Sequence, residues 1–194
     1  MDKTGLKQLL TKVKNGNIAI DKAIDYFKGM PFDNINFAKI DNHRHIRCGI
    51  PEAIFCQGKT IDQIVDIIDK VIENGIDLLA TRANDEVYAA VSKKHPKVKY
   101  NKLGRTITQK NNRQRKKNGL ILIVAAGTSD IPVAEEDRET AVIMGNNVEV
   151  LYDVGVAGIH RLLYSRDLLA KARVIIVVAG MEGALASVVG GLVD

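Results

Sequence analysis

The chain has 194 residues, of which 46% are hydrophobic and 26% charged, and its formal net charge is +5. This composition is typical of a globular protein with one large or two small domains. No apolar run reaches the roughly 20 residues that a membrane-spanning helix needs, and the N-terminal stretch lacks a signal-peptide core. The sequence therefore argues against a membrane partner and predicts a cytoplasmic protein.

The first half of the chain predicts two amphipathic helices followed by a small α/β domain. Apolar residues recur every three or four positions in residues 4–16 and 17–29, and a glycine closes each stretch. Beyond them, strands are predicted at residues 35–41, 77–83 and 105–109.

Two helices are predicted between these strands. Residues 84–95 form one, and Asn84 is placed to cap it. Residues 59–75 form the other, with Gly75 as its C-terminal stop and an apolar face expected at Ile61, Ile64, Val65, Ile68 and Ile72.

A basic run separates the two halves. Its five positive charges equal the whole net charge, with no acidic or aromatic residue among them: Lys110, Arg113, Arg115, Lys116 and Lys117. Such a run is more often a solvated linker than an RNA-binding site. The sequence therefore predicts domains at residues 1–109 and 119–194, joined by a linker at 110–118, and does not favour nucleic acid as a partner.

Strand and helix alternate after this linker. The apolar run at 120–127 is continuous, as in a strand buried on both faces of a parallel sheet, and further strands are predicted at 147–155 and 173–180. Helices are predicted at 132–145, 158–172 and 183–193. This order predicts a βαβαβ unit with right-handed crossovers, that is, an α/β fold with a doubly wound parallel sheet.

The candidate site lies in the loops that follow these strands, because ligands of open parallel sheets bind beyond the carboxyl ends of the strands. The loops are Gly127-Thr128-Ser129-Asp130, Asp153-Val154-Gly155 and Gly180-Met181-Glu182-Gly183. Glycine lets a ligand approach the backbone, helix N–H groups attract phosphate, and the acids suit ribose recognition, proton transfer or metal binding. An ordinary cap or turn explains any one loop equally well, but three together favour a nucleotide pocket.

Other motifs are absent or weak. The chain has neither a P-loop nor GxGxxG, which argues against a P-loop NTPase and a Rossmann dehydrogenase. Cys48 and Cys56 are interpreted as free thiols. His43 and His45 could share one face of a strand, but two ligands do not make a metal site, so no metal site is predicted.

The motifs together resemble the LarB proteins of nickel-pincer cofactor biosynthesis, which belong to the phosphoribosylaminoimidazole (AIR) carboxylase, or PurE-like, superfamily. The second half carries "GTSDIPVAEE", "YDVGVAGIHRLL" and "VVAGMEGALASVVGGLVD". The first half carries "FAKIDNHRHIRCGIPEAIFCQGKT", similar to a family segment at Asp41, Arg44, Arg47, Gly49, Pro51 and Glu52. The resemblance implies a flavodoxin-like second domain and a homo-oligomer, namely an octamer.

The resemblance also implies an enzymatic activity. LarB-type enzymes carboxylate the pyridine ring of nicotinic acid adenine dinucleotide with CO2 and hydrolyse its phosphoanhydride, giving pyridinium-3,5-biscarboxylic acid mononucleotide and AMP. A cysteine thiolate adds to the ring and makes a nucleophilic dihydropyridine. No tightly bound cofactor is implied, although Mg²⁺ is compatible with a phosphoanhydride. Two alternatives stay open: an AIR carboxylase, a lyase of purine nucleotide biosynthesis, and a non-catalytic nucleotide-binding protein.

Site residues follow from the matching positions. The candidate catalytic residues are Asp130, Asp153 and Glu182, and the candidate substrate-binding residues of the loops are Gly127, Thr128, Ser129, Gly155, Gly158, His160, Arg161, Gly180, Met181 and Gly183. A packed or surface histidine explains His160 equally well. Arg44 and Arg47 either bind carboxylate or phosphate or brace their own segment through ion pairs.

The nucleophilic cysteine is the point at which the chain departs from the family it resembles. The sequence ends at "GGLVD", whereas family members continue with the segment that carries this cysteine. On this resemblance, neither Cys48 nor Cys56 is expected to take its role. We therefore expect the chain to be truncated and inactive as a carboxylase in its 194-residue form.

Overall fold

The computed structural model describes residues 3–28, 32–111 and 119–193. Contacts divide the chain into two compact units, Met1–Val98 with Gln109–Asn111, and Lys99–Thr108 with Asn112–Asp194. Most of the basic linker predicted at 110–118 lies outside the described residues.

The first unit begins with two helices and a short hairpin. Helices α1 (Lys3–Lys14) and α2 (Ile20–Lys28) contact each other, as the three- and four-residue spacing predicts. Strands β1 (Phe32–Asn34) and β2 (Lys39–Asp41) pair in an antiparallel hairpin. The single strand predicted at 35–41 is therefore wrong over its first residues, where Asn36 turns the chain with a φ of 69°.

Two strand–helix pairs follow the short helix α3 (Arg44–Cys48). Strands β3 (Ile54–Phe55) and β4 (Leu78–Thr81) are parallel, and they lead into helices α4 (Ile61–Glu73) and α5 (Asp85–Lys94). Helix α4 exists as predicted, but the prediction of its buried face was wrong in part: the side chains that it buries are Ile64, Ile67, Ile68 and Val71. The histidine strand considered at 43–45 is also wrong, because α3 begins at Arg44.

A hairpin completes the sheet that contains β3 and β4. Strands β5 (Lys99–Asn101) and β6 (Thr106–Gln109) are antiparallel, and the strand order is β3-β4-β6-β5. By contacts, most of this hairpin, residues Lys99–Thr108, belongs to the second unit.

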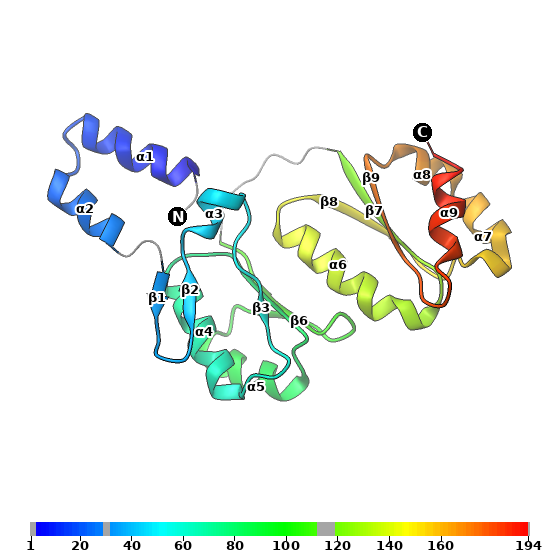
Figure 1. Ribbon diagram of the computed structural model, residues 1–194, viewed down its shortest axis with the longest axis horizontal. Helices are drawn as coiled ribbons and strands as arrows, with labels where there is room; N and C mark the ends of the chain where they lie inside the picture. The colour runs from blue at the N-terminus through cyan, green and yellow to red at the C-terminus, as the bar shows by residue number, and fades with distance from the viewer. Residues whose placement is uncertain (1–2, 29–31, 112–118, 194) are drawn as a thin grey trace. The chain divides into compact units, whose positions relative to one another are not determined.

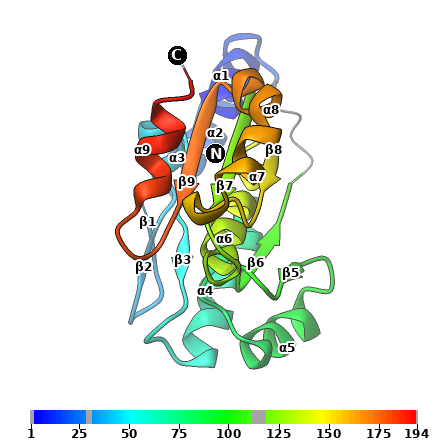
Figure 2. The same cartoon turned by 90° about the vertical axis from the view of Figure 1, so that its right-hand side faces the viewer.

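The second unit is the predicted doubly wound sheet. Strands β7 (Leu120–Ala125), β8 (Asn147–Leu151) and β9 (Val174–Val178) are parallel in the order β8-β7-β9. Helix α6 (Ile131–Ile143) covers one face, and α7 (Ile159–Tyr164), α8 (Arg166–Lys171) and α9 (Ala184–Gly190) cover the other (Figures 1 and 2). This arrangement confirms the predicted fold class.

Alternation along the central strand β7 explains the two layers. Leu122 and Val124 are fully buried against a cluster that includes residues of α7, α8 and α9, while Ile123 and Ala125 pack with Ala134 of α6. Successive side chains of a strand point to opposite faces, so a continuous apolar run fills both layers. Burying each large aliphatic side chain contributes about 1.5–3 kcal/mol.

One helix predicted in the second unit is divided into two shorter helices in the structure. The helix expected at 158–172 is interrupted at Ser165, which ends α7 and precedes α8. The interruption lets Leu162 and Leu169 both reach the same core cluster. No helix in the described part of the chain is long and apolar enough to cross a membrane.

Candidate functional site

The three predicted loops meet around one cavity of about 350 Å³ at the carboxyl edge of the second unit's sheet. Loop residues from the ends of β7, β8 and β9 all contribute to its wall. The lining consists of Ala126, Gly127, Ser129, Asp130, Asp153, Gly155, Val156, Ala157, Arg161, Ala179, Gly180, Met181, Glu182, Ala184 and Leu185. The chain runs from β7 to β8 on one side and then returns to β9 on the other, so the strand order β8-β7-β9 reverses between β7 and β9, where doubly wound sheets bind ligands.

Asp130 fixes two of these loops to each other. It follows β7 in a single 3₁₀ turn, and its carboxylate accepts a hydrogen bond from the N–H of Gly127 at 2.9 Å. The other carboxylate oxygen accepts from the N–H of Gly180, beyond β9, at 3.1 Å. Both oxygens of Asp130 are thus engaged in holding the pocket together, as a capping residue would be.

Ser129 and Thr128 lie in the same turn and are exposed. Ser129 lines the cavity, whereas Thr128 does not. Among the described residues, the Ser129 hydroxyl has no hydrogen-bond partner, so it is available to a ligand.

The second loop is held by the backbone of β7. The N–H groups of Val154 and Gly155 donate to the carbonyls of Ala125 and Ala126 at 3.2 and 2.8 Å. A Cβ on Gly155 would lie 2.9 Å from the carbonyl oxygen of Ala126, so only glycine fits here. Asp153 begins this loop with a φ of 57°, which non-glycine residues adopt uncommonly.

Arg161 and Asp153 form an ion pair in the cavity wall. The Arg161 Nη1 atom donates to Asp153 Oδ2 at 2.6 Å, and their side chains are 39% and 52% exposed. Gly158 leaves room for this arrangement, since a Cβ there would lie 2.6 Å from Arg161 Nε. His160, one residue earlier, is exposed and does not line the cavity.

The third loop presents exposed side chains at the rim. Met181 is fully exposed with a φ of 53°, and Glu182 beside it is also exposed. Gly183 begins α9 with a φ of 68° and does not contribute to the lining.

The cavity combines an apolar floor with opposite charges. Among the described residues that line it, Asp130, Asp153 and Glu182 are acidic and Arg161 is basic. Small and aliphatic residues that were not predicted complete the wall: Ala126, Val156, Ala157, Ala179, Ala184 and Leu185. The "AAG" and "VAG" stretches were a signal for the first four.

Arg44 and Arg47 lie in the first unit, on α3. The Arg47 Nη2 atom donates to Asp41 Oδ2 at 2.7 Å, and this hydrogen bond, opposed by burial, lowers the pKa of Asp41 from its ordinary value. Glu52 accepts the Asp41 N–H at 2.9 Å. This geometry is the bracing that the sequence analysis considered for Arg47, while Arg44 is exposed.

Both cysteines are free thiols, as predicted, and they differ in exposure. Cys48 is exposed, whereas Cys56 is buried, and burial raises the pKa of the Cys56 thiol to about 11. Both belong to the first unit, and neither lines the cavity described above.

The described side chains form no cluster that would bind a divalent cation. Among the side chains that the structure describes, no three of His, Cys, Asp or Glu gather as a metal site would require. In the cavity, Asp130 already accepts two amide hydrogens and Asp153 is paired with Arg161. Asp130 and Asp153 are therefore not prepared as ligands of a resident Mg²⁺.

Comparison with known proteins adds two findings. Residues 32–112 match a family model described as the LarB/PurE-like N-terminal domain. The chain is also similar to a protein of Methanocaldococcus jannaschii, named only as uncharacterized protein MJ0165, with 41% identity over 198 residues. That alignment covers 97% of this chain and 77% of the relative.

Proposed function

Because this chain belongs to the LarB family of the PurE-like superfamily, we propose that its cavity binds nicotinic acid adenine dinucleotide for ring carboxylation. The LarB/PurE-like domain by itself suggests a carboxylase-type enzyme. The proposed reaction joins CO2 to the pyridine ring and cleaves the phosphoanhydride, releasing AMP and a dicarboxylated mononucleotide. One observation carries the proposal: glycine loops from three strand ends enclose a cavity that also holds the Arg161 guanidinium.

The size of the cavity suits one half of the dinucleotide. Its volume of about 350 Å³ is at the lower end of the roughly 300–1,000 Å³ found for ligand pockets. The apolar floor offers a surface for a ring, and the exposed Ser129 hydroxyl offers a hydrogen bond. We therefore assign the nicotinate mononucleotide half to this cavity.

The Arg161 guanidinium provides the contact for an anionic group of the ligand. Guanidinium binds phosphate through two parallel hydrogen bonds, and the Arg161 Nη1 atom here donates to Asp153. A phosphate that replaces Asp153 keeps Arg161 paired and frees the carboxylate for a ribose hydroxyl. The cavity should therefore bind anionic ligands better than neutral ones, because only an anionic group can replace Asp153 as the partner of Arg161.

The remaining acids take different roles in this proposal. Asp130 shapes the pocket rather than transferring a proton, because both of its oxygens accept amide hydrogens. Glu182 is exposed at the rim and is our candidate for proton transfer or ribose binding.

Ring carboxylation needs a nucleophile that makes the pyridinium ring electron-rich. A thiolate adds to a ring carbon, the neutral dihydropyridine attacks CO2, and loss of a ring proton and of the thiolate restores the pyridinium. Cys56 is poorly suited, since burial raises the pKa of its thiol to about 11, and neither cysteine lines the cavity. We propose that the 194 residues by themselves bind the dinucleotide without carboxylating it.

Calorimetric titration of the protein with nicotinic acid adenine dinucleotide and, separately, with aminoimidazole ribonucleotide tests the proposed ligand. We expect saturable binding of the dinucleotide that Arg161→Ala weakens at least tenfold, while Arg166→Ala, an exposed arginine outside the cavity, leaves it unchanged. Preference for aminoimidazole ribonucleotide would instead support an enzyme of purine synthesis.

Mass spectrometry after incubation with the dinucleotide and ¹³C-bicarbonate tests the proposed chemistry. The family resemblance assigns the nucleophilic role to neither Cys48 nor Cys56, so we expect no labelled dicarboxylated mononucleotide from the 194-residue chain. A labelled dicarboxylated mononucleotide would show that Cys48, Cys56 or another group serves as the nucleophile, and would overturn that part of the proposal.

A further inference from the structure

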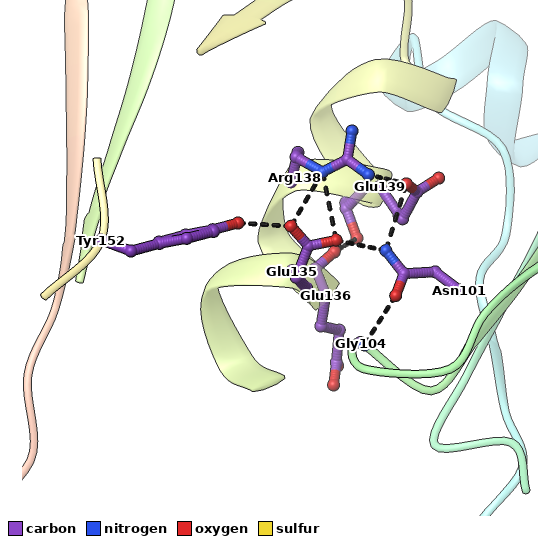
Figure 3. A network of polar contacts seen from close by, with 8 residues as sticks. Asn101, Gly104, Glu135, Glu136, Arg138, Glu139 and Tyr152 are labelled. Atoms are coloured by element: carbon purple, nitrogen blue, oxygen red, sulfur yellow. Dashed lines mark hydrogen bonds and ion pairs between the residues drawn. The ribbon is translucent and has the colours of Figure 1, made fainter. Parts of the chain in front are cut away.

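A buried carboxylate behind the second pocket loop joins three segments of the second unit (Figure 3). Glu135 of α6 is only 8% exposed, and it accepts hydrogen bonds from the Tyr152 hydroxyl and from the side-chain amide of Asn101. Arg138 Nε donates to both Glu135 oxygens at 3.1 and 3.2 Å, and its Nη2 donates to Glu139 at 2.8 Å. Glu135 therefore connects the β5–β6 hairpin, α6 and the end of β8.

The hairpin side of this network is closely packed. The N–H of Gly104 donates to Asn101 Oδ1 at 2.9 Å, which orients the amide towards Glu135. A Cβ on Gly104 would lie 2.8 Å from the backbone carbon of Glu135 and the backbone nitrogen of Glu136. The hairpin turn and α6 are thus packed backbone against backbone, with no room for a side chain at position 104.

The opposite side of the network reaches the cavity. Tyr152 follows β8 directly, packs against the core cluster beside α6, and is bonded in the chain to Asp153, which lines the cavity. The 3₁₀ turn that leads into α6 carries Ser129 and Asp130, which line the same cavity. The contact between Tyr152 and Glu135 therefore ties two walls of the cavity together from behind.

Protonation states favour this contact. Burial alone would raise the pKa of Glu135, but hydrogen bonds from Tyr152 and Asn101 and the charge of Arg138 outweigh it and lower that pKa. Burial and the bond to Glu135 raise the pKa of Tyr152. At neutral pH, Tyr152 remains a hydrogen-bond donor and Glu135 a charged acceptor, and such charge-assisted bonds are about twice as strong as neutral ones.

We propose that Glu135 and Tyr152 are positioning residues, through which the β5–β6 hairpin holds the loop of residues 153–155, and with it Arg161, in ligand-binding geometry. The inference rests on the proposed function, in that the cavity is taken as the ligand site. Residues 99–108 lie inside the stretch 32–112 that matches the N-terminal family model. The N-terminal family sequence thus supplies part of the frame of a pocket built on the second unit.

Amide hydrogen exchange in Tyr152→Phe measures this positioning directly and needs no ligand. The Val154 and Gly155 amides report on the loop, because they donate to the end of β7. We expect both to exchange about five- to tenfold faster in Tyr152→Phe, while the Leu122 and Ile123 amides of central β7 keep their rates. Tyr164→Phe makes the same chemical change at a side chain that is 94% exposed and should alter none of them.

A second variant approaches the network from the hairpin. Asn101→Ala removes the amide that links the hairpin to Glu135, and it should speed exchange at Val154 and Gly155 by a smaller factor than Tyr152→Phe. Unchanged rates at these two amides in both variants would overturn the proposal. Equal acceleration throughout β7 would also overturn it, because the network would then contribute only to overall stability.

The ligand titration separates this inference from the proposed function. If the wild-type protein does not bind nicotinic acid adenine dinucleotide, the proposed function fails, whereas the exchange rates still decide whether the hairpin holds the loop. If it binds, Tyr152→Phe should raise the dissociation constant about three- to tenfold. Faster exchange with an unchanged dissociation constant would refute the part of the proposal that concerns ligand binding.

Discussion

Strand–helix loops occur in both units, but the two units use their polar residues differently. In the first unit, Thr60 caps α4 in a capping box with Gln63, and the Asn84 side chain accepts from the N–H of Val87 to cap α5. In the second unit, the residues at the N-cap positions of α6, α7 and α9 are Asp130, Gly158 and Gly183. None of them caps its helix with a side-chain hydrogen bond. Polar loop residues therefore complete helices in the first unit and line a cavity in the second.

The difference teaches how to separate a cap from a candidate site. A cap satisfies its hydrogen bonds within its own helix, as Thr60 and Asn84 do. A site residue leaves them unsatisfied, as Ser129 does, or uses one of them between loops, as Asp130 does with the N–H of Gly180. Asp130 combines both roles, because its hydrogen bonds hold the loops and its side chain also lines the cavity.

The largest loss of stability is expected at Gly155, where the pocket backbone leaves no room for a side chain. Gly155→Ala places a methyl group 2.9 Å from the Ala126 carbonyl oxygen, and should lower the free energy of unfolding by about 2–3 kcal/mol. Gly190→Ala, with no atom within 4 Å of the added carbon, is the matched control and should change it by less than about 1 kcal/mol. Urea denaturation followed by circular dichroism measures both, and equal effects would contradict the tight fit.

The next largest loss of stability is expected on substitution of Asp130, whose carboxylate joins two pocket loops. Asp130→Asn keeps one acceptor oxygen but sets an amide NH2 against an N–H group, so it should destabilise the protein by about 1–2 kcal/mol. It should also speed amide exchange at Gly127 and Gly180. Protection at these two amides equal to that of the wild type would show that Asp130 does not hold the loops.

A paired substitution tests the comparison itself. Asn84→Ala removes a cap and should cost about 1 kcal/mol of stability without affecting ligand binding. Ser129→Ala should cost less than about 0.5 kcal/mol, because its hydroxyl is exposed, but should weaken binding of nicotinic acid adenine dinucleotide several-fold. If Ser129→Ala costs stability as Asn84→Ala does, the serine is a cap after all.

The smallest effect is the acid dependence of the first unit. Burial acts to raise the pKa of Asp69, but hydrogen bonds and charge from Lys94 and His95 lower it below its ordinary 3.8. The stabilisation from Asp69 is therefore complete above pH 3.8 and is lost as the pH falls through the lower folded-state value. Asp69→Asn should be less stable than the wild type at pH 6, and the difference in urea midpoint should shrink towards pH 3.

Local patterns predicted the fold well where one physical effect dominated. The apolar run of β7 and the isoleucine spacing of α4 determine their elements almost alone. The break at Ser165 could not be predicted, because leucines continue at helical spacing on both sides and neither glycine nor proline marks it. The buried face of α4 was misplaced because isoleucine lies on more than one side of that helix.

Some features of the candidate site could likewise be predicted from the sequence, and others could not. Topology alone brings three strand ends to one edge of a sheet, so the meeting of Asp130, Asp153 and Glu182 around one cavity could be predicted. The hydrogen bond from the Gly180 N–H to Asp130 could not, because it joins loops 50 residues apart. The contact of Glu135 with Asn101 spans 34 residues and leaves no periodic signal.

The backbone contact at Gly104 has a consequence for chain length. Each residue advances a helix by about 100°, so a single insertion between β7 and α6 would turn α6 by that angle. Glu135 would then leave both Tyr152 and Asn101, and a new side chain would face the Gly104 turn. Insertions are usually tolerated in loops, but the count of residues from Ala126 to Asp130 is set by a hairpin that begins more than twenty positions earlier.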